Sequence, residues 1–174
     1  MQFKHKNIRL PTQNYLGRGW FFITLCCERR RRIFSNGHRA CWLIDCLRRE
    51  AEASGFGIHA FCVMPDHLHL LAEGLESASD LLRFVKVLKQ RTGFLYQREF
   101  HEHLWQKKFY DHILRPHDVP DRIAWYIWMN PVRKSICAQP QEYPYSGSFT
   151  LRWERATRPE QSWAPPWKKK DMPT

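Results

Sequence analysis

Two histidines, one residue apart, stand in the stretch Phe61-Cys62-Val63-Met64-Pro65-Asp66-His67-Leu68-His69-Leu70-Leu71. Successive side chains of a β-strand point to opposite faces, so His67 and His69 share one face and Leu68 points to the other. Imidazole is a common ligand of metal ions. The pair therefore predicts half of a metal site, and the alternative is a structural pair of histidines.

The segments around this stretch predict a regular order of strands and helices from their composition and periodicity. We expect strands over 19–27, 58–63, 67–73 and within 101–115, with a turn over 64–66. We expect three helices: one over 39–53, one that follows a cap at 77–80, and one over 118–130, before Pro131. This order matches the ferredoxin-like split βαβ arrangement. The predicted fold class is α+β, an antiparallel sheet with helices on one face.

The length of 174 residues indicates one domain with a possible tail. We place a single domain over 1–138. The region 139–174 contains six prolines and ends in a basic segment that includes Lys168-Lys169-Lys170, so we expect an irregular extension there. No apolar run approaches the roughly 20 residues that span a bilayer, and the basic start is unlike a secretory signal. We therefore expect a protein that is not associated with a membrane.

The formal net charge is +11 and the sequence pI is about 9.7. Such an excess of positive charge predicts a polyanionic partner, most simply nucleic acid. A cluster of four arginines, Arg29 to Arg32, is either a phosphate-contacting loop or a solvated one. The six cysteines form no CxxC pair, so buried thiols are expected instead of disulfides or zinc.

Tyr126 and Asn130 lie four residues apart in the last predicted helix, and hence on one face of it. The amide oxygen of Asn130 is a candidate third metal ligand. Two imidazoles and one amide oxygen leave coordination positions for a phosphodiester. Tyr126 then lies one turn before the third ligand, where a metal and cationic surroundings favour its phenolate.

Several motifs together resemble a known family. Val63 to Leu71 is similar to the His–hydrophobic–His motif of single-tyrosine HUH transposases. Four other segments resemble the REP-associated tyrosine transposases, which act on short palindromic repeats. They are Gly19 to Phe22, Trp105 to His112, Tyr126 to Arg133 and Tyr143 to Ser146. The resemblance covers roughly residues 10 to 150.

The resemblance implies an HUH-type fold in which His67, His69 and Asn130 bind Mg²⁺ or Mn²⁺ and Tyr126 is the nucleophile. It implies cleavage and rejoining of single-stranded DNA, at hairpin-forming repeats, through a 5′-phosphotyrosine. Asn130 stands where insertion-sequence relatives usually have Gln. We interpret Asp66 as a turn residue; the alternative is a carboxylate that holds a histidine tautomer.

Alternatives remain open at this point. Tyr110 is the rival nucleophile, because strand alternation puts it on one face with His112. The chain is alternatively an inactive binder of DNA hairpins, a metal nuclease that uses water, or a basic interaction module with a structural histidine pair. Monomer and homodimer are both compatible with the resemblance. The candidates for contacts with the DNA backbone are Arg29, Arg30, Arg31, Arg32, Lys86, Lys89 and Arg133.

Overall fold

The computed structural model describes residues 10–153 and 156–158. A five-stranded antiparallel sheet has the order β4-β1-β3-β2-β5. Its strands are β1 (Gly19–Cys26), β2 (Phe56–Met64), β3 (His67–Gly74), β4 (Tyr110–Ile113) and β5 (Ser146–Gly147). The helices are α1 (Gly37–Ala53), α2 (Leu81–Phe100), α3 (Pro120–Trp128) and α4 (Asn130–Arg133), with 3₁₀ turns η1 (Thr12–Tyr15), η2 (Glu28–Arg30), η3 (Ile33–Ser35) and η4 (Pro140–Glu142).

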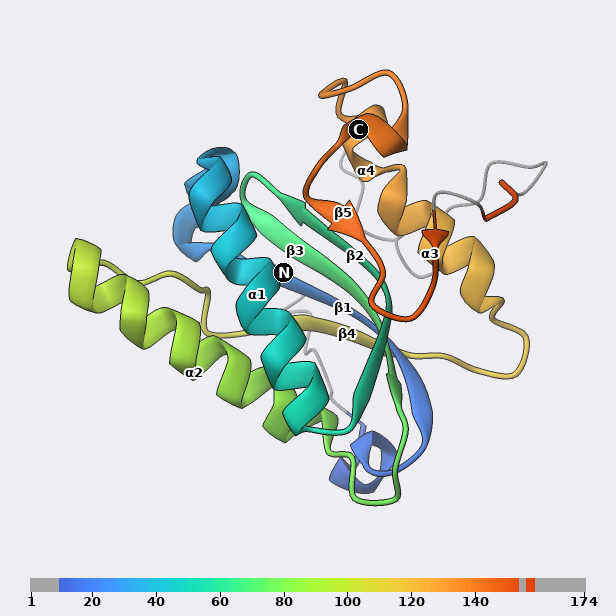
Figure 1. Ribbon diagram of the computed structural model, residues 1–174. Coiled ribbons are helices and arrows are strands. Elements are labelled where there is room, and N and C mark those ends of the chain that lie inside the picture. Colours follow the sequence, from blue (N-terminus) through green and yellow to red (C-terminus); the bar gives the residue numbers. More distant parts are fainter. Residues whose placement is uncertain (1–9, 154–155, 159–174) are drawn as a thin grey trace, which may run out of the picture.

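The expected α+β class and strand–helix order are confirmed, but the helices do not all lie on one face. Helices α1 and α2 cover one face of the sheet, and α3 lies against the other (Figure 1). Side chains alternate between the two faces of strands β1 and β3, and both faces of these strands are apolar, so each face can be covered by helices. On β1, for example, Phe21 and Ile23 belong to the core under α1 and α2, whereas Phe22 belongs to the core under α3.

Local signals account for most element boundaries. The side chain of Asn36 accepts a hydrogen bond from the backbone of Arg39 and begins α1, and Asp80 caps α2 as expected. Helix α2 continues through Gly93 to Phe100, and His101 caps its end in a left-handed conformation. The strand expected within 101–115 is short, because only four residues of it pair with β1.

The expected end of the last helix at Pro131 is wrong. Helix α3 ends at Trp128, and the chain turns at Met129 into α4, with Pro131 in its first turn. Proline lacks a backbone N–H, and the N–H groups of the first turn of a helix have no acceptor within that helix, so proline is well tolerated there. The proline therefore starts a new helical turn here.

Residues after 138 join the fold over their described part. Strand β5 pairs with β2, the Tyr143 hydroxyl donates to the carbonyl of Val63, and Trp128 donates to the carbonyl of Gly147. The division at residue 138 stays a prediction, and the lysines at 168–170 lie outside the described residues. In the part of the chain that the structure covers, no helix has the length and apolarity to cross a membrane.

The six cysteines are free thiols, and the expected burial holds fully only for Cys27 and Cys62, whereas Cys41 is exposed. Burial raises the pKa of the Cys27 and Cys62 thiols to about 12. Both thiols therefore stay protonated near neutral pH, and they act as small apolar side chains.

Candidate metal centre and nucleophile

The two histidines converge at the start of β3. His67 lies opposite Cys26 of β1, and His69 lies opposite Thr24. The two Nε2 atoms are 3.0 Å apart, and the rings are nearly perpendicular. His69 is buried and His67 is half-buried, so the pair lies at the edge of the core with one ring accessible.

Each Nδ1 atom has a partner that fixes the orientation of its ring. The Nδ1 of His67 is 2.6 Å from Asp66 Oδ1, and the Nδ1 of His69 is 2.8 Å from Thr24 Oγ1. The hydrogen bond from His67 lowers the pKa of the Asp66 carboxyl, so Asp66 is ionised and accepts the His67 proton. Asp66 is therefore not a turn residue alone: its carboxylate contacts the His67 imidazole, as the alternative interpretation expects.

This donor set fits a small divalent cation. Imidazole nitrogen is a common ligand of divalent metal ions, and the two Nε2 atoms face each other at 3.0 Å. His67 and His69 would therefore hold such an ion together, with other coordination positions left for a phosphate oxygen. Within residues 10–153 and 156–158, no cluster of three His, Cys, Asp or Glu side chains that could hold a metal forms.

Tyr126 reaches the same face of the sheet from α3. The Phe22 ring lies 5.6 Å from the His69 ring, 6.3 Å from the Tyr126 ring and 6.2 Å from the Tyr110 ring, measured between centroids. Both tyrosines are therefore one phenylalanine ring away from the histidine pair. Proximity alone does not separate the two candidate nucleophiles.

Arg133 packs on Tyr126. Its guanidinium lies 4.1 Å from the centre of the Tyr126 ring and donates to the Tyr126 carbonyl at 2.7 Å. A guanidinium over the face of an aromatic ring is a favourable contact, so Arg133 fixes the position of this ring. The role of Tyr126 as the nucleophile stays a prediction.

Asn130 is held by the carbonyls at the break between α3 and α4. Its side-chain nitrogen donates to the carbonyls of Tyr126 and Ile127, at 3.0 Å each. Ile127 is the residue whose carbonyl loses its helical partner, because Pro131 has no N–H. Both acceptors are carbonyl oxygens, so the amide must present its NH₂ to them. The NH₂ group is used by these two hydrogen bonds, so the amide oxygen is the atom of the side chain that a metal would bind.

A family model described as "Transposase IS200 like" matches residues 19–127, which is more than half of the chain. The chain belongs to the IS200-like transposase family. The matched segment includes His67, His69 and Tyr126, and it stops before Asn130. The family is one of transposases, which are DNA-binding enzymes that cleave DNA. The sequence-based family resemblance is confirmed at this level.

Known relatives of this IS200-like transposase include two curated proteins. A REP-associated tyrosine transposase of Escherichia coli is 27% identical over 75% of this chain and 76% of its own length. The ISDra2 transposase TnpA of Deinococcus radiodurans is 30% identical over 55% of this chain and 73% of its own. A solved structure of a REP-associated tyrosine transposase bound to a REP hairpin has a TM-score of 0.69 with 23% identity, covers 92% of both chains, and supports the fold.

The basic residues expected to contact DNA differ in their surroundings. Arg31 pairs with Glu102 and donates to the carbonyl of His103, and Lys89 donates to the carbonyls of Gln106 and Lys107. Lys86 is exposed on α2, which packs on the face of the sheet opposite to the histidine pair. Arg29 and Arg32 are exposed, and Nη1 of Arg30 lies 3.5 Å from Oδ2 of Asp66. Contacts of all these residues with DNA stay predictions.

Two polar contacts of this IS200-like transposase were missed in the sequence. Thr24, which holds His69, interrupts an otherwise apolar strand, and this lone polar residue was the available signal. His112 lies 3.1 Å from Asp118, whose carboxylate also accepts the backbone N–H of Arg115. Burial opposes ionisation of Asp118, but these hydrogen bonds lower its pKa overall. No local pattern indicates this pair.

Asp66→Asn is expected to weaken the response to metal about 10- to 100-fold, because the outer partner of a ligating histidine sets its tautomer and basicity. The amide can donate to Nδ1 and so move the His67 proton to Nε2. The measurement is the Mn²⁺ concentration that half-saturates DNA cleavage, with direct Mn²⁺ binding by calorimetry. An unchanged Mn²⁺ affinity would return Asp66 to the role of a turn residue.

Asn130→Asp is expected to lower the free energy of unfolding by about 1–3 kcal/mol, because a carboxylate oxygen would face two carbonyl oxygens in place of the NH₂ group. The aspartate still offers an oxygen to a metal. Thermal and urea unfolding without metal measure this effect separately from catalysis. Full retention of stability would show that the two hydrogen bonds of Asn130 contribute little.

Proposed function

We propose that this chain is a metal-dependent single-strand DNA endonuclease and strand transferase. It cleaves and rejoins DNA at hairpin-forming palindromic repeats through a 5′-phosphotyrosine intermediate. The observation that carries the proposal is the pair of imidazole Nε2 atoms, 3.0 Å apart, one phenylalanine ring from Tyr126. The printed names of the relatives, REP-associated transposases among them, support DNA hairpins as substrate. Such a substrate places the enzyme with the nucleoid in the bacterial cytoplasm.

His67, His69 and Asn130 would hold Mg²⁺ or Mn²⁺. When bound, such an ion polarises a phosphate oxygen and orients the scissile bond. Asp66 and Thr24 keep the two imidazoles in a fixed orientation. The protein thus provides a preformed pair of nitrogen ligands before any DNA arrives.

Tyr126 supplies the bond-making step. Its phenolic oxygen attacks phosphorus, the bond from phosphorus to the 3′ oxygen breaks, and the phenolic proton is lost to solvent while the leaving oxygen becomes a 3′-hydroxyl. A 3′-hydroxyl of another strand end reverses the step and rejoins DNA. The phosphotyrosine conserves the phosphodiester bond energy, so no nucleotide cofactor is needed. Arg133 lies over the Tyr126 ring and would hold it in position for this attack.

The test uses a labelled single-stranded DNA hairpin with unpaired flanks, incubated with the full chain and Mn²⁺ or Mg²⁺. A labelled protein band that survives SDS is the expected result, and chelation with EDTA is expected to remove it. Cleavage without such an adduct would indicate a water-using nuclease. Binding without cleavage would indicate a hairpin-binding protein, and the proposed function would then be wrong.

A further inference from the structure

A cavity of about 500 Å³ lies between the first turns of α1 and the last turns of α2. It is on the face of the sheet opposite to the histidine pair, because both helices pack on that face. Its lining combines aromatic and cationic side chains with one carboxylate, Glu99. The residues that the argument uses are His38, Arg39, Trp42, Tyr96, Arg98 and Phe100.

The aromatic part of the cavity is prearranged. The Tyr96 and Phe100 rings lie 4.7 Å apart, and the guanidinium of Arg39 lies 4.2 Å from the centre of the Phe100 ring. Trp42 lines the same cavity and is half-buried. A planar guanidinium and an indole at the wall of one cavity are the groups on which unpaired nucleobases stack. Arg98 is exposed and supplies positive charge at its rim, where the exposed His38 also lies.

The loop with four arginines joins this cavity to the histidine pair. On one side, the backbone N–H groups of Cys27 and Phe34 donate to the carbonyls of Asp66 and Pro65, directly before His67. On the other side, Glu28 donates to the carbonyl of Leu104, and Arg31 contacts Glu102, just after α2 ends. In Figure 1 the start of α1, the end of α2 and the turn between β2 and β3 lie at the same end of the molecule.

We propose that this cavity binds an unpaired nucleotide of the same DNA strand that is cleaved at the histidine pair. The base stacks on Trp42 and Arg39, Arg98 contacts a phosphate, and the strand passes along the loop with the exposed Arg29 and Arg32. Positive charge at the cavity and along the loop matches a nucleic acid strand, and the aromatic lining matches an unpaired base. The proposal rests on the proposed function, because it extends the binding of single-stranded DNA to a second site.

The test compares a fluorescent DNA hairpin that carries a short unpaired oligo(dT) extension with the same hairpin without it. The extension is placed on the 5′ end in one hairpin and on the 3′ end in another. Binding to the full chain is followed by anisotropy without divalent metal, so that no cleavage occurs. Trp42→Ala is expected to weaken binding of an extended hairpin about tenfold, as loss of one stacking platform does, and to leave the plain hairpin unchanged. Trp42→Phe keeps a ring and is expected to restore most of the affinity.

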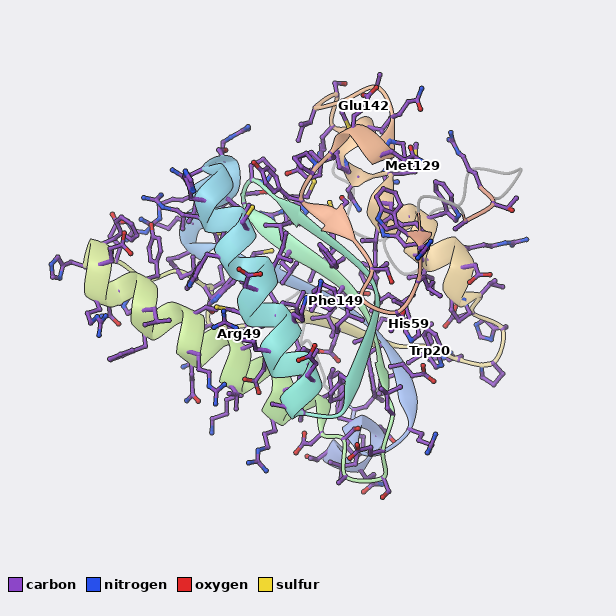
Figure 2. All side chains as sticks on the ribbon, viewed as in Figure 1. Trp20, Arg49, His59, Met129, Glu142 and Phe149 are labelled. Carbon is purple, nitrogen blue, oxygen red and sulfur yellow. The ribbon has the colours of Figure 1, made fainter. Side chains whose placement is uncertain are left out.

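Salt dependence tests the phosphate contact separately. Arg98→Ala is expected to reduce the slope of log K against log salt by about 0.7, the value for one contact with a single strand. The control is Arg49→Ala, because Arg49 is an exposed arginine on α1, one of the two helices beside the cavity, but is not among the lining residues (Figure 2). It is expected to leave the affinity gained from the extension unchanged. Thermal unfolding of each variant confirms that it is folded.

The outcomes separate this proposal from the proposed function. If wild type forms the covalent adduct and Trp42→Ala binds the extended hairpin as wild type does, the cavity proposal is wrong and the catalytic one stands. If the extension is bound through Trp42 but no adduct forms, the cavity site stands and catalysis is wrong. Substitutions that change sedimentation and not DNA affinity would assign the cavity to contact with a second copy of the chain, and would overturn the proposal.

Discussion

Tyr126→Phe is expected to remove the covalent DNA adduct completely and to lower cleavage by about a thousandfold or more, as loss of an essential nucleophile does. The substitution deletes only the phenolic oxygen. The ring that packs against Phe22 and under Arg133 is retained, and so is the backbone carbonyl that binds Asn130. The fold and the metal ligands are therefore expected to be unaffected. Gel analysis of a labelled hairpin in Mn²⁺ measures both adduct and free cleaved product.

Tyr110→Phe is the matched control for this prediction. Tyr110 lies on the same face of the sheet, and its ring is as near to Phe22 as the Tyr126 ring is. It comes from strand β4, whereas Tyr126 lies on α3 one turn before Asn130. Its substitution is expected to keep adduct formation within a few-fold of wild type. An adduct that survives Tyr126→Phe and disappears with Tyr110→Phe would exchange the two roles.

The sequence was sufficient to predict much of this site. Alternation around Leu68 predicted that His67 and His69 share a face, and the helical period placed Tyr126 one turn before Asn130. Both inferences depend only on neighbours in the chain, so local pattern was enough. The order of strands and helices also predicted the central position of β3, which the sheet confirms.

The rest depended on contacts between distant segments. Thr24 reaches His69 only because β1 pairs with β3 in one register, and a single sequence does not reveal that register. The face chosen by α3 likewise follows from tertiary packing, because both faces of the central strands are apolar. The break at Pro131 was assigned as a helix end, since the side-chain hydrogen bonds of Asn130 that bridge it are not visible in the sequence.

His67→Ala is expected to abolish the response of cleavage and of protein stability to Mn²⁺, with a loss of metal affinity of at least about a hundredfold, more than loss of an outer partner causes. His67 contributes one of the two facing Nε2 atoms and is more accessible than His69, so its removal disturbs the core less. The measurements are calorimetric binding of Mn²⁺ and the shift of the unfolding temperature on adding Mn²⁺. Both can be made without DNA.

His59→Ala is the control that distinguishes a ligand from a structural histidine. His59 is also half-buried in the sheet, and its ring stacks on Trp20 (Figure 2). Its two ring nitrogens contact Glu73 at 2.8 Å and Thr150 at 2.9 Å, so protein groups satisfy both. In His67 and His69, by contrast, the second nitrogen of each ring faces the other ring. Stability is expected to fall in His59→Ala while the Mn²⁺ response persists; a loss of that response in His59→Ala, or its survival in His67→Ala, would remove the metal from the histidine pair.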